Sequence, residues 1–131
     1  MEIINVIIAA AASFALGAVW YMALANPWME AAGIERDADG KPKGGQDPKI
    51  FALTFVMQLL VAGMMRHTFE LSGVDSYGKG IVAGIGIGLF FISPWIVINN
   101  LYGNRPLQLS VIDGGYATLA CGLMGLVLTL F

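Results

Sequence analysis

The sequence predicts an all-α protein of the membrane, a single domain (residues 1–131) folded as an integral membrane bundle of four antiparallel transmembrane helices. Composition is the first indication, because 57% of the residues are hydrophobic and 12% are charged, against roughly 45–50% and about 25% in soluble domains. Four apolar stretches are also each longer than the roughly 20 helical residues that cross a hydrocarbon core. None of them alternates apolar with polar residues, as a transmembrane strand does.

The four predicted spans are residues 3–25, 50–71, 78–101 and 107–131. The first is as apolar as a signal peptide, but it lacks a basic start and is longer than the apolar region of such a peptide, so we expect a retained span. The polar loop at about 26–49 is rich in Asp, Gly and Pro and is expected to be a hairpin or a loose loop. The connections around SGVDSYG and YGNRP are short, which favours antiparallel packing of successive helices.

The distribution of Lys and Arg predicts the orientation of the spans. The basic residues on the side of the first and third loops are Arg36, Lys41, Lys43, Lys49 and Arg105. The other side carries Arg66 and Lys79. Because cytoplasmic loops carry the excess of Lys and Arg, we expect a multi-pass protein of the inner (plasma) membrane of a prokaryote, with a cytoplasmic 26–49 loop and both termini outside. The net charge of -2 and the scattered basic residues exclude a nucleic-acid surface.

Small residues recur every four positions in three of the spans. These positions are Ala9, Ser13 and Gly17, then Gly80, Gly84 and Gly88, then Gly114, Thr118 and Gly122. Small residues at this spacing let helix backbones approach closely. The stripes either face one another inside one protomer, which we favour, or face another copy of the chain, so a homo-oligomer or a larger membrane complex stays open as an alternative.

Pro94 interrupts the third span in the sequence ISPW. It has no backbone N–H and is expected to kink the helix and to free the carbonyl of Phe90. A kink of this kind is more often a matter of packing than a gate.

Polar side chains from all four spans are predicted to lie at one depth of the membrane. Asp113 stands about six residues, hence roughly 9 Å, inside the fourth span. Counted from the same face, the predicted polar layer comprises Asp113, Tyr116, Gln58, Asn99 and Trp20. An acid in the membrane is costly, so its carboxyl group is expected to point into the bundle and either to stay protonated or to find donors. The candidate donors are Trp20, Tyr21, Gln58, Trp95, Asn99 and Asn100, with Arg105 within reach from the loop.

A second polar group ends the second span in the sequence MMRHTFEL. Arg66 and Glu70 are four residues apart and His67 lies three before Glu70, so one helix face can hold an ion pair beside a histidine. Arg66 is roughly 15 Å from Asp113 along the membrane normal, too far for direct pairing. We interpret this group chiefly as side chains that reach the outer interface.

Three sequence features carry a resemblance to a known family. They are the Trp20-Tyr21 pair, Trp28, and the stretch NNLYGNRPLQLSVIDGGY with Arg105, Pro106, Asp113, Gly115 and Tyr116. Over nearly its whole length the chain resembles the prokaryotic membrane family catalogued as domain of unknown function 1761, whose Arg-Pro and Asp-x-Gly-Tyr elements these residues match. The resemblance implies a four-helix membrane protein and brings no activity. Where relatives tend to have proline after the Trp-Tyr pair, this chain has Met22 and Ala23, and an acid common before the Arg-Pro pair is replaced by Gly103 and Asn104.

Two functions are compatible with these patterns. The first is an oligomeric carrier or channel for protons, monovalent cations or small cationic solutes, with Asp113 as the titrating or coordinating group. The alternative is a non-catalytic accessory or scaffold subunit of a membrane protein complex, in which the polar layer sets helix register. An enzyme is not expected, because the chain has no HExxH or GxSxG motif and its one His and one Cys, Cys121, supply no catalytic set. No cofactor or metal is predicted.

Overall fold

The computed structural model describes residues 3–42 and 47–131, and this part of the chain is helical, with one isolated β-bridge and no strand. The elements are α1 (Ile3–Ala23), α2 (Ala25–Ala32), α3 (Pro48–Ser72), α4 (Tyr77–Ile87), the π-helix η1 (Gly88–Ile92), α5 (Ser93–Tyr102) and α6 (Leu107–Leu130). Four helical segments are long and apolar enough to cross a membrane: α1, α3, the continuous segment Tyr77–Tyr102, and α6. The predicted helical class and the four candidate spans are therefore confirmed.

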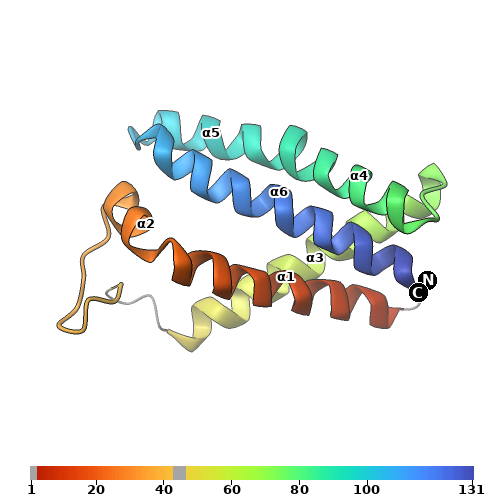
Figure 1. Cartoon of the computed structure of the whole chain (residues 1–131), viewed down its shortest axis with the longest axis horizontal. Coiled ribbons are helices and arrows are strands. Elements are labelled where there is room, and N and C mark those ends of the chain that lie inside the picture. The colour runs from red at the N-terminus through yellow and green to blue at the C-terminus, as the bar shows by residue number, and fades with distance from the viewer. Residues whose placement is uncertain (1–2, 43–46) are drawn as a thin grey trace.

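Figure 1 shows how the two ends of the molecule differ. Both termini and the α3–α4 turn lie at one end, called the terminal end below. Helix α2, the loop that follows it and the α5–α6 turn lie at the other, called the loop end. Helix α6 is in contact with α1 and with the α4–η1–α5 segment, whereas α3 packs chiefly on α1. Helix α6 is thus the central element of the fold.

The boundaries of the helices follow local signals. The Asp47 side chain accepts a hydrogen bond from the Lys49 N–H, and Pro48 begins α3, which is the favoured chemistry of a helix start. Ser76 caps α4 in the same way. Gly73 ends α3 with φ at 70°, a left-handed conformation that glycine adopts without steric cost.

The predicted 26–49 loop begins with a helix instead of irregular chain. Helix α1 ends at Ala23, the chain turns at Leu24, and α2 then runs to Ala32. Pro27 stands in the first turn of α2, where its missing N–H costs no helical hydrogen bond. Met29 is only 2% exposed, so tertiary burial holds this short helix against the rest of the protein. Residues 26–32 of the predicted loop are therefore helical, where irregular chain was expected.

The remainder of that segment forms a tight turn as far as the structure describes it. Arg36 and Pro42 make an isolated antiparallel bridge. The carboxylate of Asp37 accepts hydrogen bonds from the N–H groups of Asp39 and Lys41, both at 2.9 Å. The hairpin expected here is present at residues 36–42, whereas Lys43 lies outside the described residues.

Gly80, Gly84 and Gly88 bring the third span directly against α6. A Cβ atom at Gly84 would overlap the carbonyl oxygen of Cys121, and one at Gly88 would lie 2.5 Å from the Cα of Thr118. The glycine stripe therefore faces α6 inside one protomer, which is the favoured one of the two arrangements predicted above.

The other glycines singled out from the sequence also serve contacts within the protomer. A Cβ at Gly17 would lie 2.7 Å from the hydroxyl oxygen of Tyr116, so glycine leaves room for that ring. A Cβ at Gly114 would lie 3.1 Å from the hydroxyl oxygen of Ser93. These two positions join α6 to α1 and to α5.

The third span is irregular just before Pro94. Residues Gly88–Ile92 form a π-helical turn, in which the N–H of Ser93 bonds to the carbonyl of Gly88, five residues earlier. The hydroxyl group of Ser93 donates to the same carbonyl at 2.7 Å. A π-helical turn therefore precedes Pro94, which stands in the first turn of α5, while the kink and the free carbonyl of Phe90 stay predictions.

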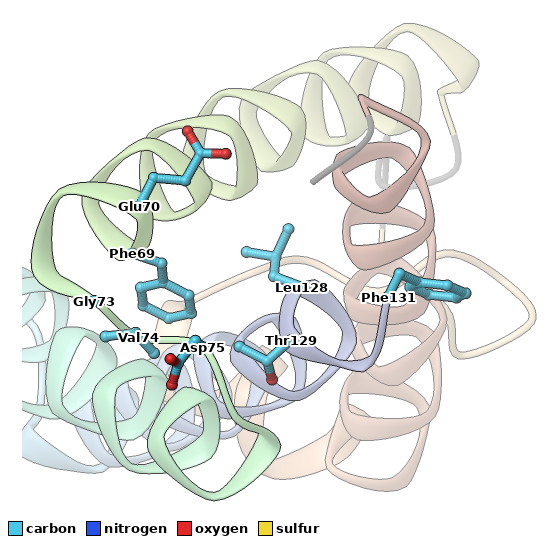
Figure 2. Close-up of a pocket in the computed structure, with 8 residues that line it drawn as sticks. All are labelled: Phe69, Glu70, Gly73, Val74, Asp75, Leu128, Thr129 and Phe131. Carbon is cyan, nitrogen blue, oxygen red and sulfur yellow. The ribbon is translucent and has the colours of Figure 1, made fainter.

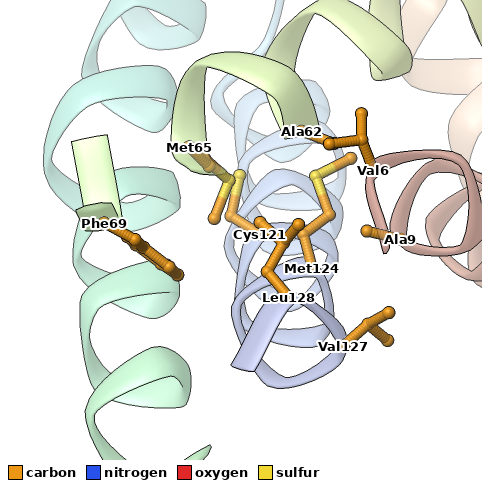
Figure 3. Packing of buried hydrophobic residues seen from close by; sticks show 9 residues of the cluster. All are labelled: Val6, Ala9, Ala62, Met65, Phe69, Cys121, Met124, Val127 and Leu128. Atoms are coloured by element: carbon orange, nitrogen blue, oxygen red, sulfur yellow. The ribbon is translucent and has the colours of Figure 1, made fainter. Parts of the chain in front are cut away.

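The apolar core lies toward the terminal end and is built from α1, α3 and α6 (Figure 3). Its buried members are Val6, Ala9, Ala62, Met65, Phe69, Cys121, Met124, Val127 and Leu128. Half of the apolar stretch of α6 is buried inside the protein, against 28% for α1 and 11% for both α3 and the third span. The fold therefore depends chiefly on what packs around α6.

Replacing Gly84 by alanine is expected to destabilise the protein by about 1–3 kcal/mol, because the new methyl group meets the α6 backbone, which cannot move aside as a flexible side chain can. Thermal unfolding in a mild detergent measures the effect. Gly86→Ala is the matched control, since a Cβ there would meet nothing within 4 Å. Equal unfolding temperatures for the two variants would contradict the close contact of α4 with α6.

Candidate functional site

Asp113 lies two turns into α6 and is half-buried. The hydroxyl group of Tyr21, in the last turn of α1, donates a hydrogen bond to Asp113 Oδ1 at 2.7 Å. Arg105, the basic residue expected to reach this acid, instead donates from Nη1 to the carbonyl oxygen of Ala32 at 2.8 Å. Within the described residues, ion pairs form elsewhere and none involves Asp113. A neutral phenol therefore holds the carboxyl group inside the span.

Tyr116 follows Asp113 by one turn and joins three helices. Its hydroxyl group donates to the carbonyl oxygen of Ser13 on α1 at 2.7 Å and accepts from Gln58 Nε2 on α3 at 2.6 Å. Because that phenol proton goes to Ser13, the amide of Gln58 must present its NH₂ group to Tyr116. The other amide atom, Gln58 Oε1, is buried without a hydrogen-bond partner. Tyr116 is thus the polar hub that ties α1 and α3 to α6.

Aromatic rings gather next to Asp113. The indole N–H of Trp20 donates to the carbonyl oxygen of Ile112 at 3.0 Å. The ring of Tyr21 meets Trp28 edge to face, with centroids 5.9 Å apart, and meets Tyr116 in the same way at 5.4 Å. We call Trp20, Tyr21, Trp28 and Tyr116 the aromatic cluster. Its rings come from α1, α2 and α6, so only the folded chain assembles it.

The structure brings together four members of the predicted polar layer: Trp20, Gln58, Asp113 and Tyr116. It does not bring in Asn99, which is exposed on α5, or Trp95, which is 65% exposed. The π-helical turn explains the difference. One extra residue in a helical turn rotates everything after it by about 100°, so depth and face counted along an uninterrupted α-helix no longer apply to α5.

Two serines missing from the predicted set hold the helices at this level. The Ser13 hydroxyl group is fully buried and donates to the carbonyl oxygen of Ala120 at 3.1 Å. The Ser93 hydroxyl group lies 3.0 Å from the carbonyl oxygen of Gly114 and 3.2 Å from the hydroxyl oxygen of Thr118. Both serines stand in apolar spans, where a hydroxyl group must find a partner within the protein, and that was the signal available in the sequence.

Two asparagines bond away from Asp113: Asn100, which was a candidate donor to it, and Asn5, which was not predicted. Asn100 donates to the hydroxyl oxygen of Ser110 at 3.0 Å, which joins α5 to α6 near the loop end. Asn5 is fully buried at the terminal end, and its Nδ2 donates to the carbonyl oxygen of Phe131 at 3.2 Å. Asn5 is far from Asp113 in the fold, so it belongs to helix packing at the other end.

The Arg66, His67 and Glu70 group lies at the terminal end, apart from Asp113. Arg66 and Glu70 form an ion pair at 3.6 Å, and His67 is exposed. A cavity of about 270 Å³ borders this group, with residues from α3, the α3–α4 turn and the end of α6 lining it (Figure 2). Its two carboxylates, Glu70 and Asp75, each have a basic partner four residues away. We therefore place the candidate site at Asp113.

No group of three or more His, Cys, Asp or Glu residues that could ligate a metal ion gathers in the part of the chain that the structure describes. Cys121 is a buried member of the apolar core built from α1, α3 and α6.

Fold and site together define an all-helical protein with four candidate membrane spans and a polar cluster within three of them, held by Asp113 and Tyr116 on α6. Residues 4–129 match the family described as protein of unknown function (DUF1761), and the chain belongs to that family. No curated protein and no solved structure matches the chain. Family membership is thus confirmed, and because the family is described as one of unknown function, function has to be argued from the site.

Replacing Tyr116 by phenylalanine is expected to lower the free energy of unfolding by about 1–3 kcal/mol, because the carbonyl of Ser13 and the amide of Gln58 lose their partner in an apolar surrounding. Unfolding in detergent is again the measurement. Tyr102→Phe removes the same atom from a residue that is 89% exposed and should leave stability unchanged. A loss of equal size in both variants would rule out the hub.

Proposed function

We propose that this protein is a carrier or channel for cations, protons included, and that Asp113 is the group that binds them. The observation that supports the proposal is the bonding of the carboxyl group. Inside a membrane span it has a hydrogen bond from the neutral Tyr21 and, among the described residues, no ion pair. A carboxylate that stayed ionised in the span without a basic partner would be costly, so the group is expected to take up a proton or another cation.

The energetics favour a mobile counter-charge at this site. An aspartate at the centre of a membrane helix costs about 2.5–3.5 kcal/mol on insertion scales, and a phenol supplies one hydrogen bond without neutralising the charge. A proton or a bound cation removes the cost, and either can leave again. Arg105 donates to the neutral carbonyl of Ala32 and makes no ion pair with Asp113 among the described residues, so its charge acts on the carboxyl group only from a distance.

The topology forms part of the proposal. We propose that the four spans pack as an antiparallel bundle in the inner membrane of a prokaryote, with the loop end in the cytoplasm and both termini outside. Arg36, Lys41, Lys49 and Arg105 lie at the loop end, whereas Arg66 and Lys79 lie toward the terminal end, and the excess of basic residues marks the cytoplasmic side. Asp113, two turns into α6 from the loop end, would then lie in the cytoplasmic half of the span.

A pair of cysteine variants tests this orientation. In a Cys121→Ser background, Asp39→Cys is expected to react with an impermeant thiol reagent only after permeabilisation, because it lies in the exposed 36–42 turn of the loop end. Asp75→Cys, in the exposed α3–α4 turn, is expected to react in intact cells. The reverse pattern would invert the topology.

The alternative is a non-catalytic accessory or scaffold subunit of a membrane protein complex. The burial of the helices is what favours it, since only 11% of the apolar stretches of α3 and of the third span is buried inside the protomer. Helices in a membrane associate through close packing and polar contacts, so these two surfaces can accept further helices or a second copy. In this case Asp113 would serve helix register alone.

Cation flux separates the two functions. Purified protein in vesicles is expected to move protons, Na⁺, K⁺ or a small organic cation down an imposed gradient, and Asp113→Asn is expected to reduce the rate at least tenfold, because the amide keeps the shape but cannot carry the charge. Asp75→Asn is the control, since it removes an exposed carboxylate at the terminal end.

The outcome that contradicts transport is equally concrete. Wild-type vesicles that carry no flux above empty vesicles, under any of these gradients, leave the accessory or scaffold subunit as the function. Flux that persists at the same rate in Asp113→Asn would keep transport but remove Asp113 from it.

A further inference from the structure

We propose that the preferred ligands of the site are small organic ammonium ions with alkyl substituents, bound between the Asp113 carboxylate and the aromatic cluster of Trp20, Tyr21, Trp28 and Tyr116. This inference rests on the proposed function, because it names the substrate class of the same site. It is argued from what surrounds the carboxyl group.

The oxygen atoms beside Asp113 are poorly suited to an inorganic cation. Na⁺ and K⁺ need several oxygen ligands to replace their hydration shell. Besides the two carboxylate oxygens, the hydroxyl oxygen of Tyr21 is the one that a hydrogen bond places beside Asp113, whereas that of Tyr116 is engaged with both Ser13 and Gln58. An alkylated ammonium ion has a weaker demand of this kind, because its charge is spread over a larger and partly apolar body.

Aromatic faces supply the missing stabilisation. A cation over the face of a Trp or Tyr ring gains about 0.5–2 kcal/mol, with Trp the best of the rings. The rings of Tyr21, Trp28 and Tyr116 are linked by edge-to-face contacts at 5.4 and 5.9 Å, so they form a connected aromatic wall. Tyr21 is the member of this wall that also bonds to the carboxyl group, which places charge and rings side by side.

Two glycines make room for the rings of this wall. A Cβ at Gly115 would lie 3.1 Å from the Trp20 ring, and one at Gly17 would lie 2.7 Å from the Tyr116 hydroxyl oxygen. Any larger residue at either place would displace a ring next to Asp113. Glycines on two helices, α1 and α6, therefore leave the space that the rings of Trp20 and Tyr116 occupy.

Helix α2 completes the site from outside the candidate spans. It carries Trp28, and it is held in place by burial of Met29 and by the hydrogen bond from Arg105 to the Ala32 carbonyl. The ring of Trp28 thereby rests against Tyr21 at the loop end of the span. A cation that approaches from the loop end would meet Trp28 before Asp113.

Choline is the probe that tests the proposal, because 3,3-dimethylbutan-1-ol has nearly the same shape and no charge. Binding to the folded state raises the unfolding temperature, so thermal unfolding in a mild detergent is followed at rising concentrations of choline chloride. A saturable rise is expected with choline and not with the alcohol. Sodium chloride at the same ionic strength is expected to give no saturable rise.

Variants locate the binding. Asp113→Asn is expected to abolish the choline response, whereas Asp113→Glu, which keeps the charge, should retain it. Trp28→Leu is expected to require about fivefold more choline for half of the effect, as the loss of one cation–π contact of about 1 kcal/mol implies. Trp28→Phe keeps an aromatic face and should lie between Trp28→Leu and wild type. Trp95→Leu, at an exposed position on α5, is the matched control and should respond as wild type does.

Each remaining outcome is decisive. An equal response to the neutral alcohol, or an unchanged choline response in both Asp113→Asn and Trp28→Leu, would overturn the proposal. Flux of protons or Na⁺ that depends on Asp113, with no choline response, would also overturn it while the proposed transport function stood. A choline response that depends on Asp113 and Trp28, with no flux of any cation, would support the site and would refute transport.

Discussion

The direct contact between the backbones of the third span and α6 is the constraint on which the rest of the structure depends. Gly80, Gly84 and Gly88 have no side chain to hold the two helices apart, so α4 and η1 lie against the carbonyl groups of α6. In lipid, helices gain little from burying apolar surface against one another, and close packing with hydrogen bonds takes over. Once this face of α6 is occupied, its remaining faces are left to α1 and α3.

That arrangement divides the molecule along its length. Toward the terminal end, the faces of α6, α1 and α3 meet through the apolar core around Phe69 and Leu128. Toward the loop end they meet through hydrogen bonds centred on Tyr116 and Asp113. The apolar half of α6 packs the helices together, and the polar half holds a carboxyl group whose described hydrogen-bond donor, Tyr21, is neutral. The proposed cation site lies in this polar half.

Several features of the fold could be predicted because they depend on local chemistry. The four spans follow from the length of apolar runs, and the spacing of Gly80, Gly84 and Gly88 predicts close helix contact, although not which helix they meet. Asp113 and Tyr116 could be recognised as a pair because three residues along a helix share a face. The donor to Asp113 could not be chosen among six candidates, since aromatic and amide groups on different helices look equivalent until the helices are placed. Tyr21 was one of those candidates, and the fold selected it.

By itself the sequence determined that the chain is helical, that four segments can cross a membrane, and that one acid lies within a span, because hydropathy and helical period are properties of consecutive residues. Tertiary structure alone decided the rest. The burial of Met29 made a helix of residues 25–32, and the π-helical turn before Pro94 rotated Trp95 and Asn99 outward. Packing of α1 and α2 on α6 gathered Trp20, Tyr21, Trp28 and Tyr116 beside Asp113. Those outcomes turn on the relative rotation and depth of neighbouring helices, which are set by contacts between residues far apart in the chain.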